Sequence, residues 1–301
     1  MSRKTLLRRH AAFSVFKIFS YLALWKAALT CLFLVLKNFF FLQYKTALFS
    51  GKIPLSDADN PLDEAIPFKP DWVAVYMDFA TFWIRTQGFL LETFGKTAHP
   101  YVKDFIFSMG RLYQTAAEVY RLNVSTTKRP AYYGNFHFIV IHLIDPHLMC
   151  IPSLHVMVMI RTYTKFRAML GALGADAQFA AEIEAARKHA IAITESILYV
   201  KQHSVNCIPA AMYAMTRFDS KLFPPEEGAR FVDALFQDGA DGISSEKSIE
   251  IKTCIAALYK QFLDEGEQAA DWKAPLLAFL QTRRHRRFQP SVQSDNGGLT
   301  R

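Results

Sequence analysis

Cysteine is scarce in this chain, and its spacing is irregular. The 301 residues include four cysteines, Cys31, Cys150, Cys207 and Cys254, and no two of them form a CxxC pair. Disulfide frameworks and structural zinc sites use regularly paired or closely spaced cysteines. The pattern therefore argues against both kinds of site and fits a reducing compartment.

Signals for β-strands and internal repeats are also weak. Apolar and polar residues show little sustained alternation, which is the pattern of a half-buried strand.

Helix signals are clear by comparison. Pro70 and Asp71 are typical of a helix start, and Gly95 of a helix end. Helices are expected at 70–95, 100–121, 180–202, 225–238, 245–264 and 269–284, with another beginning after residue 153. The sequence predicts an all-α fold.

Basic residues outnumber acidic ones, and phenylalanine is abundant. The chain has 35 Lys and Arg against 27 Asp and Glu, a formal charge of +8, and 26 Phe. Such a charge favours anionic partners, including phosphates and acidic lipids. We expect an anionic membrane surface as a partner, and we do not expect binding to a specific nucleic acid.

The segment 11–44 is apolar but interrupted by Lys17, Lys26 and Lys37. On one continuous helix these lysines would fall within roughly 100° of one another. Two arrangements fit: an amphipathic helix in the membrane interface, or a tilted span whose lysines face a bundle interior. The basic residues before it favour a cytoplasmic N-terminus, and a cleaved signal peptide is not expected. Membrane association is predicted, with a soluble or peripheral form as the alternative.

Changes in composition divide the chain into four parts. An apolar and basic helical segment, 1–50, serves as an anchor or interfacial helix, and a helical core follows at 68–220. A polar helical region at 221–285 precedes a basic tail at 286–301, which is expected to be disordered.

Three stretches of 15 residues lack Asp, Glu, Lys and Arg: 130–144, 146–160 and 202–216. Buried polar groups in such surroundings need partners or a function. The second stretch contains CIPSLHVMVMI, which places Ser153 and His155 where the long helix begins. A helix N-terminus is suited to holding an anion.

Three short motifs carry a family resemblance: TKRP at 127–130, PSLH at 152–155 and SILYVKQH at 196–203. Their order and spacing resemble the K-x6-R-P, P-S-x-H and S-R-x5-H-x3-D motifs of the type 2 phosphatidic acid phosphatase (PAP2) superfamily. The resemblance spans about 95–216. It implies a PAP2-type helical bundle, embedded in or associated with a membrane, whose active site lies between facing helices and uses no metal or other cofactor.

The resemblance also implies roles for individual residues. His203 attacks phosphorus and forms a phosphohistidine, and His155 protonates the leaving group. Implied phosphate-binding residues are Lys128, Arg129, Ser153 and Lys201, and implied supporting residues are Pro130, Asn206 and Cys207. Phosphoryl transfer needs cationic donors around the phosphate oxygens, and the planar fork of an arginine suits them.

The chain departs from the family at three charged positions, which Leu122, Ile197 and Cys207 occupy. Arg121 is adjacent to the first of these. Cys207 stands where a carboxylate would orient His203, and Asn206 is a candidate to orient the ring without adding charge. Weakened or redirected catalysis is therefore one hypothesis.

Structural roles are alternatives for the same residues. Ser153 can simply cap a helix, His155 can be a core histidine, and Lys128 and Arg129 can face solvent. His137, His142 and His147 recur every five residues, which is not the spacing of a helical metal pair. They are expected to pack or to line the site.

Three functions remain open. The first is a metal-independent phosphatase acting on a lipid phosphate or related amphiphilic phosphomonoester. The second is a phosphotransferase that moves a phospho-headgroup to an alcohol. The third is a catalytically weakened membrane protein that binds anionic lipid. Fold-level analogy does not decide among them, because function depends on the site.

Overall fold

Helices make up most of this computed structural model, which describes residues 6–48, 53–237 and 241–284. The α-helices are α1 (Ala11–Phe19), α2 (Leu22–Val35), α3 (Leu42–Leu48), α4 (Val73–Met77), α5 (Phe79–Phe94), α6 (His99–Tyr120), α7 (Phe136–Ile144), α8 (Leu154–Ala172), α9 (Ala180–Tyr199), α10 (Cys207–Phe218), α11 (Pro225–Ala234), α12 (Ser245–Gln268) and α13 (Ala274–Thr282). Two strands, β1 (Leu55–Asp57) and β2 (Val124–Thr126), pair in parallel. The prediction of a mainly helical fold is confirmed.

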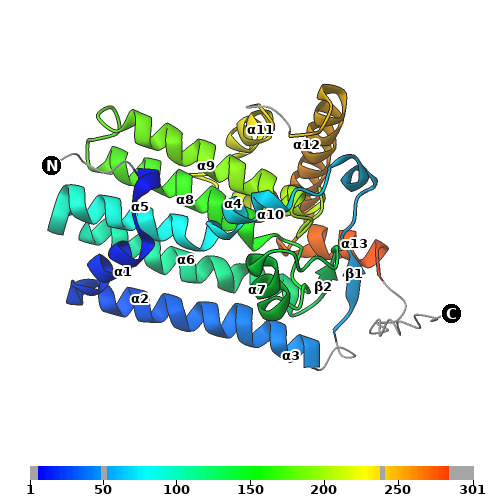
Figure 1. Ribbon diagram of the computed structural model, residues 1–301, viewed down its shortest axis with the longest axis horizontal. Helices are drawn as coiled ribbons and strands as arrows, with labels where there is room; N and C mark the ends of the chain where they lie inside the picture. The colour runs from blue at the N-terminus through cyan, green and yellow to red at the C-terminus, as the bar shows by residue number, and fades with distance from the viewer. Residues whose placement is uncertain (1–5, 49–52, 238–240, 285–301) are drawn as a thin grey trace, which may run out of the picture.

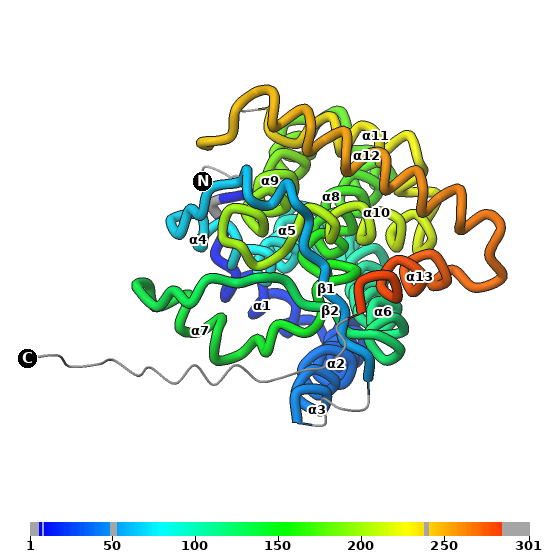
Figure 2. Tube along the Cα trace, turned by 90° about the vertical axis from the view of Figure 1, so that its right-hand side faces the viewer, coloured from blue at the N-terminus to red at the C-terminus, as the bar shows by residue number. Residues whose placement is uncertain are grey.

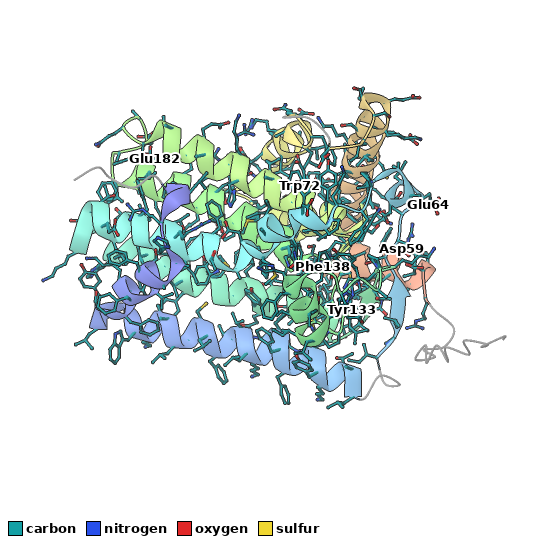
Figure 3. The ribbon with its side chains drawn as sticks, viewed as in Figure 1. Asp59, Glu64, Trp72, Tyr133, Phe138 and Glu182 are labelled. Carbon is teal, nitrogen blue, oxygen red and sulfur yellow. The ribbon has the colours of Figure 1, made fainter. Side chains whose placement is uncertain are left out.

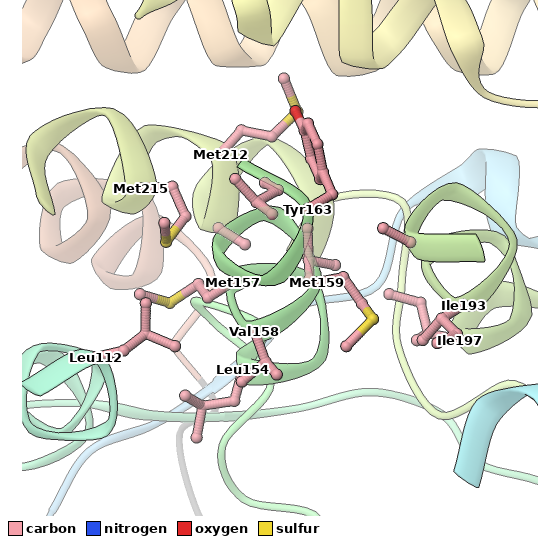
Figure 4. Close-up of a cluster of buried hydrophobic side chains, with 14 of the residues drawn as sticks. Leu112, Leu154, Met157, Val158, Met159, Tyr163, Ile193, Ile197, Met212 and Met215 are labelled. Atoms are coloured by element: carbon pink, nitrogen blue, oxygen red, sulfur yellow. The ribbon is translucent and has the colours of Figure 1, made fainter. Parts of the chain in front are cut away.

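Helix α8 lies at the centre of the bundle. Every residue from Leu154 to Thr164 is buried, as expected for a helix that is apolar on all sides. It packs against α5, α6, α9 and α10, and its methionines and Leu154 interdigitate with side chains of these neighbours (Figure 4). The N-terminus of α8 therefore opens inside the protein.

The long helices α2, α5, α6, α8 and α9 run roughly along the longest axis of the molecule (Figure 1). Helix α12 crosses them at a steep angle and packs on α10 (Figure 2). The short sheet lies at the end of the bundle where α8 begins, beside α13. One hydrophobic core extends from Leu6 to Leu280 and includes the N-terminal and C-terminal helices.

The N-terminal helices dock closely on the bundle at two glycines. A Cβ at Gly88 of α5 would lie 2.2 Å from Ser14 Oγ of α1, and one at Gly110 of α6 would lie 3.2 Å from Cys31 Cα of α2. The opposite side of α1–α3 stays exposed. Among the described residues, Leu22–Leu48 is the one helical stretch whose length and composition would allow it to cross a membrane.

Two of the predicted helices are broken. The segment 11–44 is interrupted at Ser20 and Tyr21 and contains a π-helical turn, Leu36–Phe41. The expected helix at 70–95 consists of a 3-10 turn, Pro70–Trp72, then α4 and α5, which are separated at Asp78. The Asp78 carboxylate accepts bonds from Thr81, Arg85 and His189, so tertiary partners override a continuous helical pattern.

The other helix predictions are confirmed in position. Helices α6, α9, α11 and α12 follow the expected ranges closely, and α13 begins five residues later than expected. Gly95 ends α5 with a positive φ of 57°, which is the conformation that favours glycine. The tail predicted at 286–301 lies outside the described residues.

Candidate functional site

Ser153 occupies the N-cap position of α8, but its hydroxyl makes no capping hydrogen bond. The side chain is fully buried, and its Oγ lies 3.4 Å from Nε2 of His203. A cap would direct the hydroxyl at the free N–H groups of the first turn. The Ser153 side chain instead faces His203, the histidine of the third motif.

His155 and His203 form a buried pair. Nδ1 of His155 lies 3.1 Å from Nε2 of His203, and both residues are 8% exposed. Tyr76 and Phe79 pack on the His155 ring, with centroids 4.6 and 3.9 Å away. The aromatic walls fix the orientation of His155 toward its partner.

The loop between α9 and α10 turns His203 into the bundle. The backbone N–H groups of Gln202 and His203 both donate to the carbonyl of Ile197, and Lys201 takes a left-handed conformation with φ 54°. Such bonds satisfy carbonyls that the end of a helix leaves free. The KQH segment is therefore held as the closing turn of α9.

A pocket of about 410 Å³ opens on the His203 side of the pair. Its lining residues are Asp59, Asn60, Asp63, Glu64, Phe68, Thr127, Lys128, Arg129, Pro130, Lys201 and His203. Both terminal nitrogens of Arg129 donate to the carbonyl of Asp145 at 3.3 Å, and one donates to Oε1 of Gln202 at 3.2 Å. Arg129 is thus positioned at the wall of this pocket, whereas Lys128 is more exposed.

The structure brings seven of the predicted site residues together and gives Asn206 a different role. Lys128, Arg129, Pro130, Lys201 and His203 line one pocket, and Ser153 and His155 contact His203 from α8. The Asn206 side chain bonds to Asn60 and to the carbonyls of Ala58 and Asp59, so it braces the segment after β1. Arg121 pairs with Asn38 and lies outside the pocket lining.

Cys207 begins α10 and is fully buried. Burial raises the pKa of its thiol well above the usual value, so it carries no negative charge at neutral pH. Nδ1 of His203 lies near the Cys150 backbone but makes no hydrogen bond of ordinary geometry within the described residues. Within the part of the chain that the structure describes, no carboxylate is hydrogen-bonded to that nitrogen.

Two further residues, Asp145 and His147, lie at the site outside the three motifs. Asp145 accepts a bond from the His147 backbone N–H, and His147 Nε2 lies 2.8 Å from Thr127 Oγ1. The His147 and His203 rings are 6.5 Å apart. Burial opposes ionisation of Asp145, but its bond to His147 and the charges of His147 and Arg129 hold the carboxyl pKa below its usual value. A negative charge therefore lies close to the histidine pair.

Burial dominates the acid–base behaviour of the pair. It lowers the pKa of His155 to about 4, and the Asp145 charge opposes this only in part. Burial and the neighbouring His155 lower the pKa of His203 well below its usual value. Both rings are therefore neutral at pH 7, which leaves His203 able to act as a nucleophile.

Carboxylates line the same pocket. Asp59 and Glu64 lie at the end of the bundle beside β1 and α13 (Figure 3). Asp59 accepts the Lys128 backbone N–H, and Asp63 accepts those of Asn60 and Val205. Burial raises the pKa of both Asp59 and Asp63. Lys201 Nζ donates to the Asp63 carbonyl, and burial lowers its pKa.

No group of three or more His, Cys, Asp or Glu side chains within the described ranges is arranged to hold a metal ion. His137 is exposed, His142 is partly buried, and His147 is buried at the site.

Comparison with known proteins gives no match: no family model fits the chain, and neither a curated protein nor a solved structure is significantly similar to it.

Proposed function

We propose that this protein is a metal-independent phosphatase of the PAP2 type that acts on a lipid phosphate or related amphiphilic phosphomonoester. One observation carries the proposal. Nε2 of His203, the nitrogen that would attack phosphorus, lies within 3.4 Å of both Ser153 Oγ and His155 Nδ1 at the wall of a pocket that Arg129 also lines. Residues of the second motif thus contact the histidine of the third, and Arg129 of the first motif lines the same pocket.

The chemistry follows from the arrangement. Arg129 and Lys128 bind the phosphate oxygens, and the Ser153 hydroxyl and the α8 N-terminus add donors where an anion is held. His203 attacks phosphorus through Nε2, and the protonated form of His155 donates a proton to the leaving oxygen as the phosphorus–oxygen bond breaks. This form is the minor one at pH 7, because burial lowers the pKa of His155 to about 4. Water then attacks the phosphohistidine and releases inorganic phosphate.

Nucleophilic attack requires a lone pair on Nε2 of His203, so its ring proton must reside on Nδ1. That nitrogen faces the Cys150 backbone rather than a carboxylate. A neutral neighbour stabilises the developing imidazolium less than an ionised one does. We therefore expect a slower enzyme than the family pattern implies, with Asp145 supplying the nearby negative charge.

Membrane association is part of the proposal. The outer side of α1–α3 exposes a row of large apolar side chains, including Phe16, Leu22, Leu29 and Phe33, each more than half exposed. Lys26 and Lys37 are exposed on the same segment. Apolar side chains with interspersed lysines suit the boundary between headgroups and acyl chains.

The test is phosphate release from decyl phosphate by the purified, detergent-solubilised protein. The proposal predicts release that persists with EDTA, stops with vanadate and disappears in His203→Ala. His137→Ala is the matched control, because His137 is exposed and has no contact with the pair. Release that is unchanged in His203→Ala would refute the phosphohistidine chemistry.

The carboxylates favour a second candidate function. Asp59, Asp63 and Glu64 face the same pocket as Arg129, and a purely anionic headgroup gains nothing from them. A headgroup that carries both a phosphate and an ammonium group would be complementary in charge to both the basic and the acidic side chains of this pocket. A headgroup phosphotransferase would then consume a zwitterionic phosphodiester only when an acceptor alcohol is added, and would release little inorganic phosphate.

A further inference from the structure

A second pocket of about 350 Å³ reaches the histidine pair from the opposite side. Its lining residues are Val15, Ile18, Phe19, Ala28, Cys31, Leu32, Val35, Phe39, Phe40, Phe79, Ala80, Trp83, Ile84, Ile106, Tyr113, Leu154 and His155. His155 is the single ionisable imidazole in an otherwise apolar lining. The pocket's outer wall is formed by α1, α2 and the π-helical turn, which lie outside the 95–216 region that carries the motifs.

The two pockets meet at the histidine pair. His155 lines the apolar pocket and His203 lines the charged pocket, and their facing nitrogens are 3.1 Å apart. In a ligand with an anionic head and an apolar chain, the head would fit the charged pocket and the chain would fit the apolar pocket. His155, the proposed proton donor, therefore stands at the boundary between the charged pocket and the apolar pocket.

We infer that the apolar pocket binds the hydrocarbon chain of the leaving alcohol, and that α1, α2 and the π-helical turn select amphiphilic phosphomonoesters over short polar ones. This inference rests on the proposed function and adds the part of the site that recognises the alcohol. The bond that breaks joins phosphorus to the alcohol oxygen, and His155 gives that oxygen its proton. The phosphoryl group passes to Nε2 of His203, and the neutral alcohol remains on the His155 side.

The surface around the apolar pocket is suited to contact with a membrane that contains such a ligand. Phe13, Phe16, Phe19 and Leu32 of its outer wall or the adjoining surface are 41–69% exposed. No Asp or Glu occurs before Asp57, whereas nine Lys and Arg residues do. This apolar surface with basic side chains suits contact with anionic lipid. A single-chain or diacyl phosphate can then pass from the lipid layer directly into the apolar pocket.

Ala80 allows the pocket to be filled without disturbing the core. It lines the pocket, and its side chain is exposed, so Ala80→Trp places an indole in the pocket. Ala256 on α12 is also exposed but lies outside the pocket lining. Ala256→Trp is therefore the matched control for helix propensity and surface hydrophobicity.

The experiment measures binding of n-alkylphosphonates, from butyl to decyl, to the full chain by calorimetry. Phosphonates are not hydrolysed, so binding is read separately from turnover. We expect the Kd to fall about fourfold with each added methylene. Ala80→Trp should remove most of this dependence, and Ala256→Trp should preserve it.

The outcomes separate the two proposals. A Kd that is independent of chain length, or an unchanged dependence in Ala80→Trp, would overturn the chain-binding pocket even if decyl phosphate is hydrolysed. A steep dependence that Ala80→Trp removes would support the pocket even if no phosphate is released, and would then indicate a lipid-binding protein. His203→Ala should keep the chain-length dependence, because His203 lies outside the apolar lining.

Discussion

Three side chains, Ser153, His155 and His203, meet at the N-terminus of α8. The Ser153 hydroxyl makes no bond to the helix and faces His203, and the His155 ring packs against Tyr76 and Phe79. A serine that only capped the helix would bond to the first-turn N–H groups. The observed contacts favour the anion-binding role over the structural alternative.

The first residue-scale prediction concerns pH. His155 must be protonated to act as an acid, and its pKa is lowered to about 4, so above this pH its protonated fraction falls tenfold per unit. His203 must be neutral, and its lowered pKa keeps it so. We expect kcat/KM for decyl phosphate to fall as pH rises from 5 to 8, relative to 4-nitrophenyl phosphate, whose leaving group needs no acid.

The aryl phosphate loses its second proton at lower pH than the alkyl phosphate, so each profile is first corrected for the titration of its own substrate, and the corrected ratio isolates the leaving-group proton. The ratio should become independent of pH in His155→Asn. A ratio that is already constant in the unaltered protein would exclude His155 as the acid.

The second residue-scale prediction concerns Arg129. Its two terminal nitrogens are held by the Asp145 carbonyl and by Gln202, and a lysine cannot reproduce this planar fork. We expect Arg129→Lys to lower kcat by roughly 10²-fold, the usual effect of removing one stabilising donor. Arg121→Lys is the control, because Arg121 pairs with Asn38 away from the pocket. Equal effects in steady-state kinetics would show that Arg129 is not a phosphate ligand.

The motif residues of the site could be predicted from the sequence, because Ser153, His155 and His203 occur in short patterns with a fixed order. The place of Asp145 could not. It lies near the pair only after the chain turns back between α7 and α8, where it bonds to His147. Asn206 was expected beside His203, but a distant segment supplies its partner, Asn60.

At the scale of elements, close contact between helices holds α1 and α2 over the apolar pocket. Local patterns predicted most helix positions, since apolar spacing and terminal Pro or Gly are encoded within a few residues. The break at Asp78 could not be predicted in this way. It depends on His189, which lies 111 positions away along the chain.

Gly88→Ala tests the docking of α1. The new methyl group would lie 2.2 Å from Ser14 Oγ and 3.1 Å from the Ser14 Cα, so the backbone of α1 must move. Overpacking of this kind costs about 1–3 kcal/mol, and a lower free energy of unfolding is expected by urea denaturation. Gly171→Ala in α8 is the control, since nothing lies within 4 Å of its Cβ. Equal or higher stability of Gly88→Ala would contradict the close docking.

Across the whole molecule, charge and apolar surface are divided between the two ends of the chain. The first 56 residues carry no acidic side chain, and their exposed helical face is rich in phenylalanine and leucine. Helices α11 and α12 carry exposed glutamates and lysines instead. We expect this asymmetry to orient the N-terminal helices, and with them the opening of the apolar pocket, toward an anionic surface.

Lys26 provides the test of this orientation. A lysine near an anionic membrane contributes about 1 kcal/mol, so Lys26→Gln should weaken binding to phosphatidylserine-containing vesicles about fivefold in sedimentation assays. Lys221→Gln, which removes an exposed lysine outside the N-terminal helices, should change binding little. Both differences should shrink at high salt, because exposed charges are then screened. A larger effect of Lys221→Gln would place the membrane contact elsewhere.

The most direct test of the central claim is to detect the phosphorylated intermediate. The protein is mixed with decyl phosphate, quenched in alkali to preserve phosphohistidine, digested and analysed by mass spectrometry. The account predicts one phosphate on the peptide that contains His203, absent from His203→Ala and from vanadate-treated protein. Turnover without that modified peptide, or phosphate on a different residue, would contradict attack by His203.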